Sequence, residues 1–292
     1  MSVMSKNKTK AKKTNQFLYV MKRLSKNKAA MISLIIFALV VFVAIFAKWL
    51  APYDYTKLDP RASFASPSLA HPFGCDKMGR DILSRLMIGA GYSLSIGVLG
   101  VIFSNIMGMF FGAIAGFFGQ KADNIVMRIM DVVQSIPGIL LSMIVSTVLG
   151  PGYLNTVLAL SIGAIPNTSR MLRGCILTIR NQEYVEAAES INCSKARIIL
   201  SHVIPNCFSP ILVGATMGIG GTISAAASLS FIGLGIQPPM AEWGAMLSDG
   251  RNYITTHPHM LLFPGLTIAI VIFCLNILGD GLRDVLDPKL KK

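Results

Sequence analysis

Long apolar runs, separated by shorter polar segments, dominate the pattern of the chain. The first run covers residues 29–50, and five more follow, at about residues 88–119, 124–149, 153–168, 208–232 and 260–278. A helix of roughly 20 apolar residues spans the hydrocarbon core of a bilayer, and a helix satisfies its backbone hydrogen bonds internally. The pattern therefore predicts an all-α polytopic membrane protein with six transmembrane helices.

The composition agrees with this class. The chain has 292 residues, of which 53% are hydrophobic and 14% are charged, whereas a soluble domain usually carries about 25% charged residues. The net charge is +13, but the basic residues lie between apolar runs and do not alternate with aromatic residues. They therefore favour contact with membrane lipid, not with nucleic acid.

The distribution of lysine and arginine predicts the orientation. The first 28 residues hold nine of them and no acid, and with six spans 20 of the 27 basic residues fall on the same side as this tail. That side is the cytoplasm by the positive-inside tendency, so both termini are expected there. The predicted organisation is a basic cytoplasmic tail at 1–28, a first transmembrane helix at 29–50, an extracytoplasmic segment at 51–87, a five-helix core at 88–288 and a basic tail at 289–292.

The longest polar run between two apolar runs covers residues 183–206. Asn181 can cap a first short helix, whose early glutamates suit the positive end of the helix dipole. Asn192 is predicted to end that helix, because Asn tolerates the left-handed conformation found at helix ends. Ser194 can cap a second short helix, and Pro205 then turns the chain into the next apolar run.

This run resembles the EAA loop of ABC-importer permeases, the cytoplasmic element that docks onto a separate ATPase. Glu186, Ala187 and Ala188 match its first three positions, and Ile204-Pro205 matches its end. The family usually has Gly where this chain has Asn192, and both residue types accept a positive φ. The resemblance implies a cytoplasmic coupling loop at 176–206 with these candidate coupling residues: Glu183, Glu186, Ala187, Ala188, Asn192, Ser194, Ile204 and Pro205.

Three further blocks, at residues 71–85, 233–251 and 275–288, are similar to the second permease subunit of dipeptide, oligopeptide and nickel importers, with Cys75 where Thr is usual. The resemblance implies the type I ABC-importer transmembrane fold in a bacterial cell membrane. It also implies that the chain forms half of a heterodimeric translocation pathway for di- or oligopeptides. Nickel or a metal chelate is the alternative cargo. The implied partners are a homologous second permease, two ATP-binding subunits that hold ATP and Mg, and an extracytoplasmic substrate-binding protein.

The chain lacks the motifs of an ATPase. It contains no G-x-x-x-x-G-K-[ST] motif and no Gly-Lys pair, so it has no phosphate-cradling loop of that class. No Ser-His-Asp or Cys-His arrangement indicates catalysis, and a non-catalytic subunit without a cofactor of its own is expected. Ionisable residues are nearly absent from the middle of the apolar runs, which disfavours an ion-coupled secondary carrier. A purely structural membrane subunit is the third interpretation.

A cluster of polar residues before the second apolar run is a candidate metal site. His71, Cys75 and Asp76 could ligate a metal, but three ligands so close in sequence need a supporting shell that the sequence does not show. We therefore favour a turn there, with Asp81 and Arg85 paired at i,i+4 on an interfacial helix.

Polar residues inside the apolar runs suggest a substrate path. Asn105, Ser135 and Asn155 are the candidates, although each could instead pair with a neighbouring helix. The glycines repeated every four residues over Gly108–Gly116 are predicted to form a helix-packing face, because small residues let helices approach closely in lipid.

Overall fold

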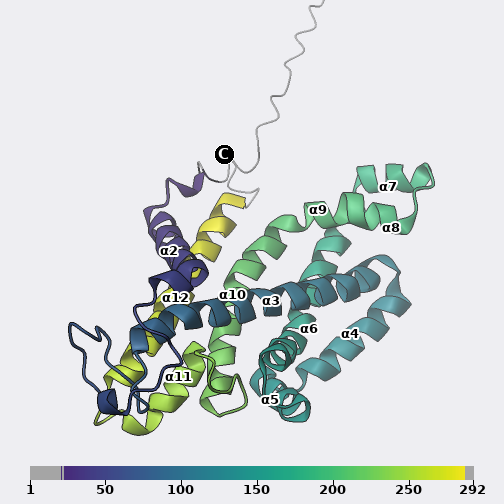
Figure 1. Ribbon diagram of the computed structural model, residues 1–292. Coiled ribbons are helices and arrows are strands. Elements are labelled where there is room, and N and C mark those ends of the chain that lie inside the picture. Colours follow the sequence, from purple (N-terminus) through teal and green to yellow (C-terminus); the bar gives the residue numbers. More distant parts are fainter. Residues whose placement is uncertain (1–20, 22, 287–292) are drawn as a thin grey trace, which may run out of the picture.

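The computed structural model describes residues 21 and 23–286, and every named element in these ranges is helical (Figure 1). The long helices are α2 (Lys28–Leu50), α3 (Ile82–Phe117), α4 (Gln120–Gln134), α5 (Gly138–Leu149), α6 (Tyr153–Ile179), α10 (Phe208–Phe231) and α12 (His259–Leu286). The shorter elements are η1 (Pro60–Ala62), α7 (Glu183–Ser190), α8 (Lys195–Ile198), η2 (Ile199–Val203), α9 (Ile204–Asn206), α11 (Trp243–Gly250) and η3 (Arg251–Tyr253). The all-α class is confirmed for these residues, whereas the predicted tail at 1–28 lies largely, and that at 289–292 wholly, outside them.

Side chains fix where several helices begin. Asn27 caps α2, where its Oδ1 accepts a hydrogen bond of 3.2 Å from the Ala30 amide. The Glu242 carboxylate caps α11 by accepting from the amides of Gly244 and Ala245 at 2.9 and 2.8 Å. Each cap satisfies amides that the first turn of a helix leaves without an intrahelical partner.

Four helices are long and apolar enough to cross a membrane: α2, α3, α10 and α12. The pair α4 and α5 makes a fifth if it is one broken span, bent by 83° at a break that ends with Pro137, the residue before α5. The described residues therefore contain four or five such helices, where the sequence predicts six spans. The difference lies in α6, which continues past the predicted end at residue 168 to Ile179 and takes in two arginines.

The glycines of α3 pack directly against α6. A Cβ built on Gly108 would lie 2.5 Å from the Thr168 Cβ, and one on Gly112 would lie 2.6 Å from the Ser169 carbonyl oxygen. A Cβ on Gly116 would lie 2.8 Å from Ile176. Side chains cannot occupy these positions unless the helices separate, so the packing face predicted for this stripe is confirmed.

A buried tryptophan joins α11 to α3. Trp243 is 1% exposed and packs in a core with Ile82 and Leu86. Its indole Nε1 donates a hydrogen bond of 3.0 Å to the Leu86 carbonyl. Gly89 admits the connecting backbone, because a Cβ there would lie 2.0 Å from the Ala241 carbonyl oxygen. The segment after α10 is thus fixed to the start of α3.

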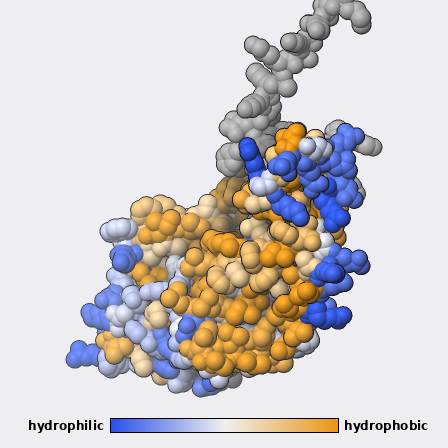
Figure 2. All heavy atoms as spheres, turned by 90° about the vertical axis from the view of Figure 1, so that its right-hand side faces the viewer, coloured by the Kyte–Doolittle hydropathy of each residue, from blue (hydrophilic) through white to orange (hydrophobic). Residues whose placement is uncertain are grey.

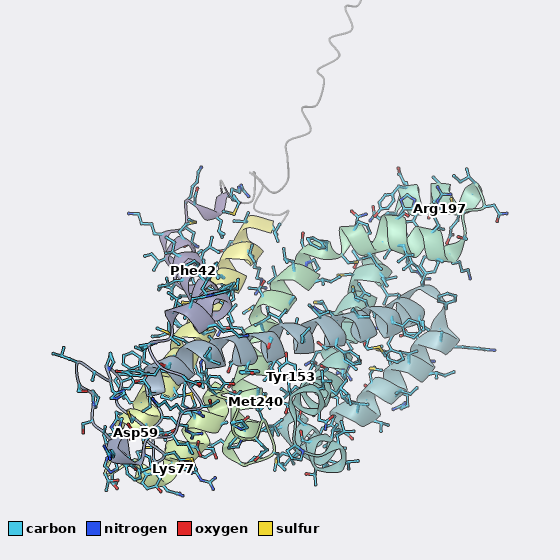
Figure 3. All side chains as sticks on the ribbon, in the orientation of Figure 1. Phe42, Asp59, Lys77, Tyr153, Arg197 and Met240 are labelled. Carbon is cyan, nitrogen blue, oxygen red and sulfur yellow. The ribbon has the colours of Figure 1, made fainter. Side chains whose placement is uncertain are left out.

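The two ends of the molecule differ. In Figure 1, the short helices α7, α8 and α9 lie at the same end as the start of α2 and the end of α12, while α11 lies at the other end. Figure 3 shows Arg197 of α8 far from Asp59 and Lys77. Figure 2 shows a broad hydrophobic surface between hydrophilic regions, and large apolar side chains such as Phe42 of α2 are exposed. This surface is suited to lipid or to other transmembrane helices.

Candidate functional site

The polar loop, which we define as residues 182–206, folds into the two-part helical structure that its sequence predicts. Asn192 has a φ of 59°, the left-handed conformation expected there. The Ser194 hydroxyl accepts a hydrogen bond of 3.4 Å from the Arg197 amide and caps α8. One detail of the prediction was wrong: Gln182, not Asn181, holds the first cap position, and it makes no side-chain capping hydrogen bond.

The second half of the loop differs in shape from the expected short α-helix. After α8 the chain widens into the π-helical turn η2 and continues through α9. Pro205 has no amide hydrogen to donate to the preceding turn, and such wide turns commonly accompany an interrupted hydrogen-bond ladder. Pro205 lies inside the short helix α9 and does not end the helical structure. The next long helix, α10, begins three residues later at Phe208.

One face of the loop is anchored to the rest of the chain. Val185 and Ala188 of α7 are buried at 0% and 6% exposure. They belong to one apolar cluster whose other buried members are Leu172, Ile176, Ile198, Val203, Cys207 and Ile211. The cluster connects the loop to α6 and α10, so the loop is attached to both helices through packed side chains.

The face of α7 next to the buried one is exposed and partly apolar. Tyr184 is 43% and Ile191 is 75% exposed, and Ala187 lies between them on the solvent side. Spacings of i, i+3 and i+7 place these three residues on one stripe of a helix. Glu183 and Glu186 are exposed beside the stripe. Sequence reasoning missed Tyr184 and Ile191, although this periodicity was available to reveal them.

Polar contacts connect the base of the loop to the α3–α4 corner. The Arg180 guanidinium donates to the Gly116 carbonyl at 3.4 Å, and the Lys195 ammonium lies 5.4 Å from the centre of the Phe118 ring. A displacement of the loop would therefore act on α3 as well as on α6.

Two ion pairs join α6 to α4 in the same region. Arg170 pairs with Asp131 at 2.6 Å, and Arg173 pairs with Asp123. The four charged groups lie half-buried or exposed, so solvent reduces the strength of each pair. Because each arginine of α6 is paired with an aspartate of α4, the two helices can pack together although α6 carries two positive charges.

A cavity of about 460 Å³ lies between α3, α5, α6 and α10. Its polar lining is neutral and consists of Ser104, Asn105, Ser142, Asn167, Thr168 and Thr222. The Asn105 Oδ1 accepts a hydrogen bond of 3.3 Å from the Thr168 hydroxyl. Hydroxyl and amide groups of this kind can bind the backbone amides of a ligand.

The structure brings only one of the three predicted substrate-path residues to this cavity. Asn105 lines it, whereas Ser135 is exposed at the end of α4 and donates to the Val132 carbonyl at 2.7 Å. The Asn155 amide donates to the Leu149 and Gly150 carbonyls and closes the turn between α5 and α6. Ser135 and Asn155 therefore have local structural partners.

The segment at 51–81 contains a buried charge network. The Asp76 carboxylate pairs with Arg80 at 2.6 Å and lies 3.8 Å from Arg85. Arg80 also contacts Asp249 of α11 at 3.2 Å, and Lys77 pairs with the same aspartate at 3.0 Å. The network links this segment to α11 and occupies Asp76, which therefore is not positioned beside His71 and Cys75 as a third ligand.

Asp81 has different partners from those expected. Its Oδ2 accepts a hydrogen bond from the Ser84 amide and caps α3, and its Oδ1 lies 2.9 Å from His71 Nδ1. The expected pair of Asp81 and Arg85 is not formed, because both carboxylate oxygens of Asp81 have other partners and Arg85 donates to the Tyr55 carbonyl. Burial and the nearby carboxylates raise the pKa of the Cys75 thiol to about 11.

The fold and the polar loop define a non-catalytic transmembrane subunit of an ABC importer. The chain belongs to the family of binding-protein-dependent transport system inner membrane components, whose model matches residues 108–292. Residues 15–67 match the N-terminal TM domain of oligopeptide transport permease C. Membership of this family places the chain in a membrane, as the permease component of a transport system.

Relatives cover nearly the whole chain. The dipeptide transport system permease protein DppC of Alkalihalophilus pseudofirmus is 42% identical over 92% of this chain and 89% of the relative. The glutathione transport system permease protein GsiD of Escherichia coli is 44% identical over 92% of this chain and 89% of its own length. The di/tripeptide transport system permease protein DppC of Pseudomonas aeruginosa is 41% identical over 91% of this chain and 89% of its own.

Solved structures show the same fold at lower sequence similarity. The MetNI methionine ABC transporter, in an inward-facing conformation, contains a chain that aligns with a TM-score of 0.57 and 19% identity. The alignment covers 70% of this chain and 98% of that chain. The transmembrane fold of type I ABC importers, implied by the sequence resemblance, is therefore shared.

Proposed function

We propose that this chain forms half of a heterodimeric pathway for the import of di- or oligopeptides, and that separate ATPase subunits drive it through the polar loop. The observation that carries the proposal is the two-sided structure of α7. Its buried face is packed onto α6 and α10. Its exposed face presents Tyr184 and Ala187 beside two glutamates, and the exposed Ile191 follows directly after the helix. An apolar stripe with a charged rim is typical of a protein-binding surface.

The same geometry provides a route for transmitting force. Closure of the ATPase pair around its nucleotide would push α7, and the apolar cluster would pass the displacement to α6 and α10. The contacts of Arg180 and Lys195 would pass it to the α3–α4 corner. Rigid-body tilting of these helices alternates access between the two sides of a membrane. ATP and Mg belong to the partner subunits in this mechanism.

The proposed topology has six spans, with the α4–α5 pair as the third and α6 as the fourth. Both termini are cytoplasmic, on the side of the polar loop. The segment at 51–81 and α11 are then extracytoplasmic, where a substrate-binding protein docks. In Figure 1, α7 lies at the same end of the molecule as the start of α2 and the end of α12, which supports this arrangement.

The cavity favours a peptide over a metal ion as cargo. Among the residues that the structure describes, its lining contains neutral hydroxyl and amide groups and no His, Cys, Asp or Glu, which are the usual protein ligands of nickel and similar ions. The names of the relatives refer to dipeptides, di- and tripeptides and glutathione. A homologous second permease would complete the wall of the pathway.

Uptake by the assembled complex tests the proposal. The chain, its second permease, the ATPase subunits and the binding protein are reconstituted in vesicles and supplied with labelled dipeptides, labelled oligopeptides or nickel. ATP-dependent accumulation of peptide and not of nickel is expected. Accumulation of nickel alone would overturn the cargo, and accumulation driven by an ion gradient in vesicles that contain only this chain would overturn the coupling.

A further inference from the structure

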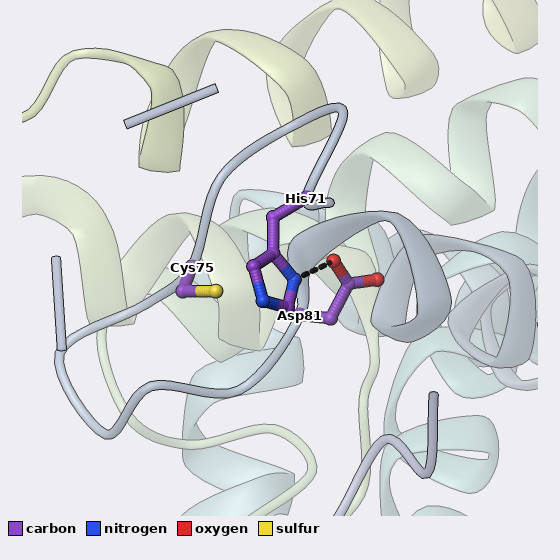
Figure 4. Close-up of side chains that lie close together, drawn as sticks. All are labelled: His71, Cys75 and Asp81. Atoms are coloured by element: carbon purple, nitrogen blue, oxygen red, sulfur yellow. Dashed lines mark hydrogen bonds and ion pairs between the residues drawn. The ribbon is translucent and has the colours of Figure 1, made fainter. Parts of the chain in front are cut away.

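His71, Cys75 and Asp81 form a compact group of metal-ligating side chains within the described residues. One ligand atom from each lies within 4.8 Å of the other two. Figure 4 shows the three side chains converging at the start of α3. Cys75 and Asp81 are buried, and His71 is half-buried. The group lies in the 51–81 segment and its junction with α3, away from the cavity and from the polar loop.

We infer that these three residues bind a divalent cation of borderline softness, with zinc as the representative ion. The set offers one sulfur, one nitrogen and one oxygen, all of which zinc accepts at about 2.0–2.3 Å in tetrahedral sites. Ligand atoms at such distances from one ion lie roughly 3–4 Å apart, and the present spacing therefore needs only small adjustments. Water can take the fourth position, because His71 leaves one side of the group open to solvent.

The contact between His71 Nδ1 and Asp81 Oδ1 has two possible roles. At 2.9 Å it is a hydrogen bond in the structure, and the same separation suits one edge of a coordination polyhedron. A bound cation would replace the proton that the two groups share. It would also displace the thiol proton of Cys75, since the thiolate is the form that ligates metals.

The surrounding residues hold this group in place. The Ser84 amide and hydroxyl both donate to Asp81 Oδ2 at 2.7 Å, which leaves Oδ1 directed toward His71. The Tyr53 ring lies 4.7 Å from the His71 ring, centre to centre. The Cys75 amide donates to the Ala65 carbonyl at 2.9 Å. Such outer-shell contacts orient metal ligands, and the sequence alone does not display them.

A catalytic Cys-His-Asp arrangement is the other chemistry that this group suggests. Cys75 is 0% exposed, so a substrate could not reach its sulfur atom. A small cation that arrives beside the half-buried His71 needs much less access. In this role the ion would fasten the 51–81 segment to the start of α3, in addition to the contact of Asp76 with Arg85 of α3.

Cobalt binding to the full chain in its assembled complex tests the inference. The metal-free complex is titrated with Co²⁺ alone, and thiolate-to-cobalt charge transfer is followed in the near ultraviolet. We expect the band to saturate at one Co²⁺ per chain and to disappear when Zn²⁺ is added. Cys75→Thr should remove the band and weaken Co²⁺ binding at least about tenfold, while Cys274→Ser, which changes a buried thiol elsewhere, should leave both unchanged.

His71→Ala provides an independent readout, because His71 is half-buried and its loss creates no deep cavity. It should weaken Co²⁺ binding at least about tenfold while peptide uptake without added metal stays unchanged. The absence of a thiolate band at one equivalent of Co²⁺ would overturn the inference. A band that persists in Cys75→Thr would overturn it equally, because the sulfur ligand would then lie elsewhere.

Discussion

Ala187 and Ala188 are neighbours in sequence, yet Ala188 is buried and Ala187 is exposed on α7. Ala188 is 6% exposed and packs with Leu172 and Ile176 of α6, whereas Ala187 is exposed to solvent. Successive residues of a helix point about 100° apart. The two alanines therefore have separable roles: Ala188 maintains the attachment of the loop, and Ala187 contributes to the surface proposed to meet an ATPase.

Substitution of each alanine by leucine should separate stability from coupling. Ala188→Leu overpacks a filled cluster and should lower the free energy of unfolding by about 1–3 kcal/mol. Ala187→Leu should change it by less than about 0.5 kcal/mol and still reduce ATP-driven uptake at least about tenfold, the effect of about 1.4 kcal/mol at a docking surface. Thermal unfolding and vesicle uptake measure the two effects. Equal destabilisation by both variants would contradict the two-sided description of α7.

The left-handed conformation of Asn192 makes a second prediction. Glycine adopts a φ near 59° without strain, so Asn192→Gly should preserve stability and uptake. Asn192→Val should destabilise the loop by about 1–2 kcal/mol, because a β-branched side chain is strained in that conformation. Proteolysis of the loop under native conditions measures its local opening. Similar cleavage rates for the two variants would show that the turn does not depend on this residue.

The close approach of α3 and α6 predicts a third pair of outcomes. A Cβ at Gly112 would lie 2.6 Å from the Ser169 carbonyl oxygen, whereas a Cβ at Gly174 would meet no atom within 4 Å in the part of the chain that the structure describes. Gly112→Ala should therefore destabilise the protein by about 1–3 kcal/mol. Gly174→Ala should be neutral or slightly stabilising, because alanine favours helix more than glycine does. Thermal unfolding of both variants checks this, and a neutral Gly112→Ala would contradict the observed packing.

Local rules predicted the features that depend on a few adjacent residues. The positive φ of Asn192 and the cap at Ser194 follow from the preferences of those residue types. The glycine stripe over Gly108–Gly116 was likewise visible in the sequence. In each case the determining residues lie within one or two turns of helix, so the sequence pattern contains the necessary information.

Features that depend on distant partners were not predictable in this way. Arg173 lies within α6 because Asp123, from another helix, pairs with it, and the predicted span ended before this charge. Asp81 pairs with His71 and not with Arg85, which is nearer in sequence. One of its carboxylate oxygens contacts His71 and the other caps α3. Helical periodicity places Ala187 and Ala188 on different stripes, but which of the two is buried depends on where α6 and α10 lie.

The environment of Cys207 makes a prediction about thiol chemistry. Burial, with the Cys175 thiol beside it, raises the pKa of Cys207 from its ordinary value of 9.0 to about 12. The folded protein then keeps this thiol protonated as pH rises from 9 toward 12, while the unfolded chain loses the proton. Stability contributed by the protonated thiol is therefore complete below about pH 9 and falls above it.

Alkylation of the native protein measures this protection. At pH 8 the thiolate fraction of Cys207 is about 10⁻⁴, since each pKa unit above the pH lowers it tenfold. Maleimide should leave Cys207 unmodified until the protein unfolds, and should modify the half-buried Cys193 first. Mass spectrometry of the digested chain distinguishes the two sites. Equal modification of both in the folded protein would contradict the burial of Cys207.

The last prediction concerns the cavity proposed as part of the peptide pathway. Gly221 lines it, and a Cβ there would meet no atom of the described residues within 4 Å. Gly221→Leu should therefore fit without disturbing the helices, change the free energy of unfolding by less than about 0.5 kcal/mol, and fill space that a peptide would need. Uptake should fall while ATP hydrolysis by the complex continues, because the polar loop is unchanged. Gly174→Leu, which adds the same side chain on the exposed side of α6, is the matched control. Normal uptake by Gly221→Leu would show that the cargo passes elsewhere.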